Sequence, residues 1–190
     1  MRILTHAFIF GILGLLFALA ARPSAAQQTD PSNFRNESEY LLRLAEFTEW
    51  PQPPGETPRR AFNFCVLGHE QYGELLDKAL LGHSVGDKRI VIVRGQHLHD
   101  MGTCDALFVG ASKSHAEVDQ LERKPNCAVL IIGDEPGFAA HGGMIQLVKE
   151  DGRTAFLINV DAARRAGLKI SASLLALATV VYDRPANGAN

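Results

Sequence analysis

A glycine-rich stretch from Gly137 to Leu147 is the first place where the sequence could do chemistry. It reads "GFAAHGGMIQL", and glycine-rich turns can cradle nucleotide phosphates when they open a helix whose free N–H groups hold the anion. Neither of the known glycine spacings fits this stretch, and the residues after it alternate as strands do. We therefore interpret Gly142 and Gly143 as a structural turn, in which glycine takes positive φ and lets the chain reverse tightly into a strand.

Two histidines in the motif "QHLHD" could ligate a metal ion together with an aspartate. His97 and His99 could face the same way on an extended segment, with Asp100 beside them. A zinc site needs three or four converging ligands, and the sequence shows no second cluster that would supply the others. We expect a solvated loop here, with no metal and no cofactor.

A lysine and two serines in "LKISAS" could form a nucleophile and its base. The order of Lys169, Ser171 and Ser173 is not the S-x-x-K of serine–lysine enzymes, and the serines stand where helix caps are expected. The motif H-E-x-x-H does not occur, and G-x-S-x-G occurs once, as "GHSVG" over residues 82–86. It lies between a predicted helix and a predicted strand, and not at the strand-to-helix turn that exposes a nucleophilic serine. We therefore expect no catalytic residues, and a protein that binds rather than one that catalyses.

Cysteine chemistry depends on the compartment, and the amino terminus points to export. An apolar run, "FIFGILGLLFALAA", is followed by the small residues "SAAQ", as in a secretory signal peptide cleaved after Ala26. The run is shorter than the ~20 residues that span a membrane, although an uncleaved anchor stays an alternative. We expect residues 1–26 to be the signal peptide, 27–182 one exported domain and 183–190 a polar tail.

Charge and cysteine count limit the partners of the exported chain. The 19 basic residues lose Arg2 and Arg22, which leaves 17 against 21 acidic ones, a net charge of −4 with histidines neutral. The sequence has no basic patch of the kind that indicates nucleic-acid binding. Three cysteines leave one unpaired. A bridge from Cys65 to Cys104 would stabilise the folded domain by about 4 kcal/mol according to the loop-entropy model. Cys127 fits a buried hydrophobic residue better than a reactive thiol.

Alternating strands and helices must position these groups. Apolar spacing predicts an amphipathic helix over 33–50, ended by a proline-rich loop. Continuous apolar runs favour strands buried on both faces, and hence a largely parallel sheet covered by helices on both faces. The predicted strands are 61–68, 88–95, 104–112 and 127–134, and the predicted helices are 72–82 and 114–124.

The carboxyl-terminal third predicts a hairpin and two helices. Residues 143–160 read as two strands around Glu150, Asp151 and Gly152, which we expect to add an antiparallel edge to the sheet. Asn159 would cap a short helix over 160–167, and Ser171 or Ser173 a last helix over 171–182. That last helix is apolar nearly all round, so it is buried or packs on a second copy, and a homodimer stays open. The fold class is thus a single-domain α/β protein with a carboxyl-terminal hairpin.

Five ordered blocks between Tyr40 and Tyr182 resemble the YfiR-like periplasmic proteins. They read "FTEWP", "FCVLG" with "YGELLDKALLG", "CDALFVGAS", "GDEPGFAAHGGMIQL" and "FLINVDAARRAGLKISASLLALA". The resemblance implies an α/β regulator that represses an inner-membrane diguanylate cyclase of the YfiN type by binding its periplasmic region. An outer-membrane lipoprotein of the YfiB type would draw the repressor away, so that cyclic di-GMP output and biofilm formation change.

The resemblance also implies roles for particular residues. It implies a disulfide between Cys65 and Cys104, whereas a second disulfide that some members have near the GGM turn finds no cysteine at Ala139 or Gln146. Leu157 stands where relatives can have an acidic residue, and one interface charge can change partner specificity. We expect a partner or ligand surface formed by Gly142, Gly143, Met144, Leu157, Asn159, Lys169 and Ser171. The alternative function is a periplasmic module that binds a small molecule at the strand ends.

Overall fold

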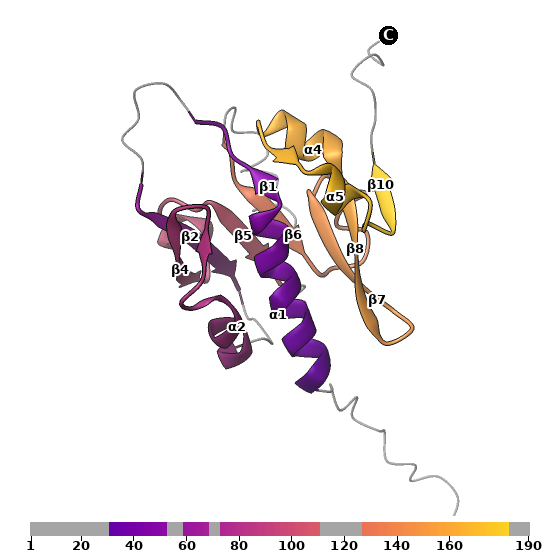
Figure 1. Cartoon of the computed structure of the whole chain (residues 1–190), viewed down its shortest axis with the longest axis horizontal. Coiled ribbons are helices and arrows are strands. Elements are labelled where there is room, and N and C mark those ends of the chain that lie inside the picture. The colour runs from indigo at the N-terminus through magenta and orange to yellow at the C-terminus, as the bar shows by residue number, and fades with distance from the viewer. Residues whose placement is uncertain (1–30, 53–58, 69–72, 111–126, 183–190) are drawn as a thin grey trace, which may run out of the picture.

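One mixed sheet organises the protein (Figure 1), whose computed structural model describes residues 31–52, 59–68, 73–110 and 127–182. Its strand order is β10-β8-β7-β6-β5-β2-β4-β3. Five neighbouring pairs are parallel, and the pairs β3–β4 and β7–β8 are antiparallel. The predicted largely parallel α/β sheet is therefore confirmed. The strands are β2 (Ala61–Leu67), β3 (Ser84–Val85), β4 (Lys88–Gly95), β5 (Ala106–Val109), β6 (Leu130–Gly133), β7 (Ile145–Glu150), β8 (Arg153–Asn159) and β10 (Val180–Tyr182).

The central strands are apolar along their whole length, and their side chains are buried. Every residue of β5 and β6 is buried, which is the pattern of interior parallel strands. In β2 the side chains of Phe62 and Phe64 lie on one face and Cys65 on the other, as alternation predicts. The four predicted strands before the glycine turn all exist, with β2 and β4 close to their predicted bounds.

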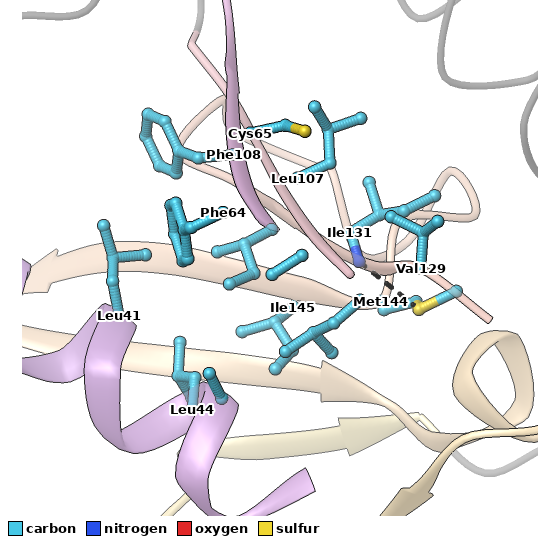
Figure 2. Close-up of a cluster of buried hydrophobic side chains, with 14 of the residues drawn as sticks. Leu41, Leu44, Phe64, Cys65, Leu107, Phe108, Val129, Ile131, Met144 and Ile145 are labelled. Carbon is cyan, nitrogen blue, oxygen red and sulfur yellow. Dashed lines mark hydrogen bonds between the residues drawn. The ribbon is translucent and has the colours of Figure 1, made fainter. Parts of the chain in front are cut away.

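Helix α1 (Pro31–Glu46) covers one face of the sheet. Figure 2 shows Leu41 and Leu44 directed from this helix toward Phe64 and Ile145 of the sheet. Helix α2 (Gly73–Leu80) packs beside α1. A helix predicted for the other face, 114–124, lies outside the described residues, as do the predicted signal peptide and polar tail, so covering of both faces is only partly shown. No helix in the described ranges is long and apolar enough to cross a membrane.

The first helix is shorter than predicted because its last residues form a strand. Strand β1 (Thr48–Glu49) pairs antiparallel with β9 (Lys169–Ile170), and Ser171 N–H donates to the carbonyl of Phe47 at 3.0 Å. We call the two paired segments, 47–49 and 169–171, the ribbon. Pro51 follows two residues after Glu49 and disfavours helical backbone at Trp50, which is consistent with an extended chain after α1.

The predicted last helix is wrong over most of its length. Helix α5 spans only Ala172–Leu175, and β10 then pairs in parallel with β8, with Val180 opposite Leu157. The run "TVVY" is rich in β-branched and aromatic residues, which favour strands, and short apolar runs do not distinguish the two states by periodicity. Because β10 covers β8, the hairpin is not the edge of the sheet.

The predicted hairpin itself is confirmed. Strands β7 and β8 pair antiparallel over six residue pairs, from Ile145 opposite Ile158 to Glu150 opposite Arg153. Asp151 and Gly152 both have positive φ, 48° and 75°, as tight two-residue hairpin turns require. Desolvation lowers the pKa of Lys149 in β7, whose ammonium donates to Thr154 Oγ1 at 3.1 Å.

Candidate partner-binding surface

The connection from β6 to β7, residues 134–144, contains the glycine motif and is a compact crossover. Strands β6 and β7 are parallel, and only two residue pairs are in register, Ile132 with Ile145 and Gly133 with Gln146. A parallel connection normally needs a dozen or more residues. This shorter one suffices because β7 begins beside the carboxyl end of β6. The predicted tight reversal is therefore wrong in one respect, since the chain continues in the same direction.

The glycines of this crossover serve two different needs. Gly142 has φ 116°, in the positive range predicted for it. Gly143 instead makes room for the ring of Phe138, because an added Cβ would overlap the Phe138 Cε1 atom. A Cβ at Gly133 would come within 2.8 Å of the same ring. The buried Phe138 ring thus lies between two residues that must lack a side chain.

Two carboxamide side chains hold the peptide groups of Ala139. The Gln146 Oε1 atom accepts from the Ala139 N–H at 3.2 Å, and the Asn159 Nδ2 atom donates to the Ala139 carbonyl at 2.8 Å. Gln146 is 4% exposed. We call Gln146 and Asn159 the carboxamide clamp. Asn159 also caps helix α4 (Val160–Arg165), since its Oδ1 atom accepts from Ala162 N–H at 3.0 Å, which confirms the predicted cap.

The tip of the crossover is exposed while its base is fixed. Pro136, Ala140 and His141 are exposed. The His141 Nδ1 atom lies 2.8 Å from the carbonyl oxygen of Gly137, within hydrogen-bond distance. The crossover therefore presents three exposed residues on a backbone that packing and hydrogen bonds hold in place.

Two residues of the predicted surface are not available to a partner. Met144 is 2% exposed, and its sulfur lies 3.5 Å from the Ile131 N–H (Figure 2). Gly143 is buried under Phe138. The prediction of surface contacts at these two positions is corrected: both belong to the core, because the crossover packs on the sheet instead of extending from it. Gly142, Leu157 and Asn159 are half-buried.

Lys169 and Ser171 lie on the ribbon. Phe47, Glu49 and Lys169 are exposed there, and Thr48 is buried between them with its hydroxyl donating to the Leu44 carbonyl. Lys169 is directly opposite Glu49. Ser171 caps α5, with its Oγ accepting from Leu174 N–H at 3.2 Å, so the predicted cap is confirmed.

Sequence reasoning missed a buried charge at the amino end of β5. Asp105, 3% exposed, accepts from Arg59 Nη2 at 2.5 Å and from the Asn63 N–H at 2.8 Å, and its carbonyl accepts from Trp50 Nε1 at 3.1 Å. Trp50 and Arg59 stand on either side of the proline-rich loop, so one residue fastens both ends of that loop. The only signal in the sequence is an acidic residue directly before a buried strand.

The implied disulfide is confirmed next to this aspartate. Cys65 and Cys104 are bonded, with a Cα–Cα distance of 5.8 Å, and Cys127 is a half-buried free cysteine. The histidine motif forms no ligand set: the rings of His97 and His99 stack at 5.3 Å, and Asp100 accepts from the His97 N–H at 3.0 Å. No group of three potential ligands lies among the residues with described positions.

These features define a small α/β domain with an exposed crossover tip and an exposed ribbon. The chain belongs to the YfiR/HmsC-like family, whose model matches residues 35–179. Among solved structures it is similar to a conserved domain protein from Vibrio cholerae O1 biovar El Tor strain N16961, at 16% sequence identity and a TM-score of 0.47. That alignment covers 77% of this chain and 60% of the Vibrio chain.

Proposed function

We propose that this protein is a periplasmic regulator that represses an inner-membrane diguanylate cyclase of the YfiN type by binding its periplasmic region. Family membership over residues 35–179 is the observation that carries the proposal. The repressor would lower cyclic di-GMP and with it biofilm formation. An outer-membrane lipoprotein of the YfiB type would compete for the repressor and so relieve the repression.

The exposed parts of the predicted surface suit such contacts. The ribbon offers an aromatic side chain, Phe47, two positions from a cross-strand pair of opposite charges, Glu49 and Lys169. Interfaces are enriched in aromatic residues at their centre and carry charged groups at the rim. The half-buried Leu157 and Ser171 remain candidates at the margins of the contact.

Repression by binding requires a difference in affinity between two states of the cyclase. A ligand moves an equilibrium only as far as it prefers one state. A full switch from 1:99 to 99:1 needs about 5.5 kcal/mol of differential affinity. A domain of this size can supply that difference through an ordinary interface, without any chemical step.

The test is a gene deletion combined with direct binding. Deletion should raise cyclic di-GMP and surface attachment, and the wild-type gene supplied in trans should restore both. The purified protein should bind the isolated periplasmic region of a YfiN-type cyclase from the same organism. Unchanged cyclic di-GMP after deletion, together with no binding, would contradict the proposal.

A small-molecule-binding module is the second candidate function. Strand β2 pairs with β4 on one side and with β5 on the other, so the direction of winding reverses at β2. Ligands of open α/β sheets bind at such reversal points, outside the carboxyl ends of the strands. Native mass spectrometry of protein purified from periplasm would detect a retained metabolite, and an unchanged cyclic di-GMP level in the deletion strain would then favour this function.

A further inference from the structure

We infer that Gln146 and Asn159 are positioning residues for partner recognition, because they hold the crossover 134–144 in one conformation and present its exposed tip to the cyclase. The inference rests on the proposed function and goes beyond it, since it assigns the contact to Pro136, Ala140 and His141. The predicted surface contained none of these three residues.

The chemistry of Gln146 is the first argument. A buried carboxamide loses hydration, and it adds little net stability even when it is hydrogen-bonded. An apolar side chain at this position of β7 would bury equally well, but it would remove the acceptor of the buried Ala139 N–H. The carboxamide instead fixes one peptide orientation, because its Oε1 atom accepts from Ala139 N–H at 3.2 Å.

The second argument is the convergence of two strands on one residue. Gln146 comes from β7 and Asn159 from the end of β8, and they hold the N–H and the carbonyl of the same alanine. Phe138, the residue before it, is fixed between Gly133 and Gly143. Three independent contacts therefore define the backbone directly before the exposed Ala140 and His141.

The third argument is the contrast between the fixed base and the exposed tip. Pro136, Ala140 and His141 are exposed although the segment between them is anchored in the core. A recognition loop that is already ordered loses less conformational entropy when its partner binds. A loop populated in its competent form for only a tenth of the time binds about tenfold more weakly.

Two clamp variants test the inference without removing the helix cap. Asn159→Asp keeps an oxygen that can cap α4 but loses the Nδ2 donor to the Ala139 carbonyl. Gln146→Met keeps much of the side-chain volume and removes the acceptor for Ala139 N–H. Gln52→Met, at an exposed position, is the matched control. A fourth variant, Ala140→Arg, blocks the tip and leaves the clamp intact.

Amide hydrogen exchange of the free protein and affinity for the cyclase periplasmic region are measured together. Both clamp variants should exchange faster at residues 139–143, with exchange at Leu130–Gly133 unchanged, and their Kd should rise about tenfold. Ala140→Arg should raise Kd with unchanged exchange, and Gln52→Met should change neither. If one clamp variant does not fold, the other and Ala140→Arg still decide the question.

Three results would overturn the inference. The clamp variants could leave exchange in the crossover unchanged, or loosen it while Kd stays within twofold of wild type. Ala140→Arg could bind as tightly as wild type. The first result is measured on the free protein, whereas the two results that concern Kd require that the wild-type protein binds the cyclase. A wild-type protein that does not bind at all would instead refute the proposed function, and the inference with it.

Discussion

Two loops are fastened to the same sheet by opposite kinds of chemistry. At the amino end of β5 the two residues that flank the proline-rich stretch, Trp50 and Arg59, are held by Asp105, next to the covalent bond of Cys104. At the carboxyl end of β6 the crossover 134–144 is held by neutral carboxamides and by a ring between two glycines. Salt and reductant act on charges and disulfides, so they should affect the first region and leave the second unchanged.

Of the changes that test this comparison, removing the disulfide should have the largest effect on the free energy of unfolding. Cys65 is fully buried in β2, and loss of a native disulfide from a small secreted domain typically costs about 2–5 kcal/mol. We expect Cys65→Ser to lower the free energy of unfolding by that amount, measured by urea denaturation. Dithiothreitol should lower the free energy of unfolding of the wild-type protein toward that of the variant.

Cys127→Ser is the control, and it should lose much less stability because Cys127 is unbonded and half-buried. Peptide mapping without reductant should show the pair Cys65 and Cys104. A bridge that includes Cys127 would contradict both the fold and the comparison.

Neutralising the buried charge should have the next largest effect. Asp105→Asn keeps an oxygen that can accept from the Asn63 N–H, but it loses the charge-assisted bond to Arg59. Hydrogen bonds to charged groups contribute about 1.5–3 kcal/mol to stability. Because the Arg59 side chain is half-exposed, we expect Asp105→Asn to lower the free energy of unfolding by an amount near the lower end of that range.

Salt decides whether the effect of Asp105→Asn is electrostatic. The stability difference between wild type and variant should shrink between low salt and 1 M sodium chloride, because salt screens partly exposed pairs. A difference that stays constant with salt would mean that packing, and not charge, fastens this loop.

The stability of the crossover should depend on side-chain packing and not on charge. Gly143→Ala places a methyl group against the ring of Phe138, which cannot move away because Gly133 lies against it as well. Overpacking of this kind costs about 1–3 kcal/mol, and the penalty should not depend on salt. Thermal or urea denaturation at two salt concentrations measures it.

A second substitution identifies the cause of that penalty. In a Phe138→Leu background, Gly143→Ala should be less harmful, because the smaller side chain removes the overlap and the two effects are not additive. Gly152→Ala, which has open space but φ 75°, is the control for backbone strain alone. Equal penalties at Gly143 in both backgrounds would refute the packing explanation.

Local rules of the sequence predicted much of this fold. The strands around Phe64 and Ile92 follow from apolar runs, and the caps Asn159 and Ser171 follow from residue preferences at helix starts. The ribbon was missed because two-residue strands have no periodicity. The apolar residues before Tyr182 fit a helix and a strand equally well, so periodicity predicts a helix where the structure has β10.

The site was harder to predict because its contacts join distant residues. The bonds from Trp50 and Arg59 to Asp105 span 55 and 46 positions, and no local pattern encodes them. The predicted surface includes Met144, whereas the parallel crossover buries it. Gln146 lies in an alternating strand that gave no sign of its contact with Ala139.

The ribbon carries exposed charges, and Lys169→Glu should change stability least and function most. Lys169 lies opposite Glu49, so the substitution places two like charges across the strands and should cost only a few tenths of a kcal/mol. We expect the variant to be folded and exported, and to bind the cyclase periplasmic region more weakly, with cyclic di-GMP raised.

The double variant Glu49→Lys with Lys169→Glu restores the cross-strand pair in reverse. If the pair merely stabilises the ribbon, the double variant should recover full repression. If Lys169 contacts the partner, the double variant should recover stability and still repress poorly, because a reversed charge pattern no longer complements the same partner. Full repression by the single variant would remove Lys169 from the proposed contact and leave the crossover tip as the remaining candidate.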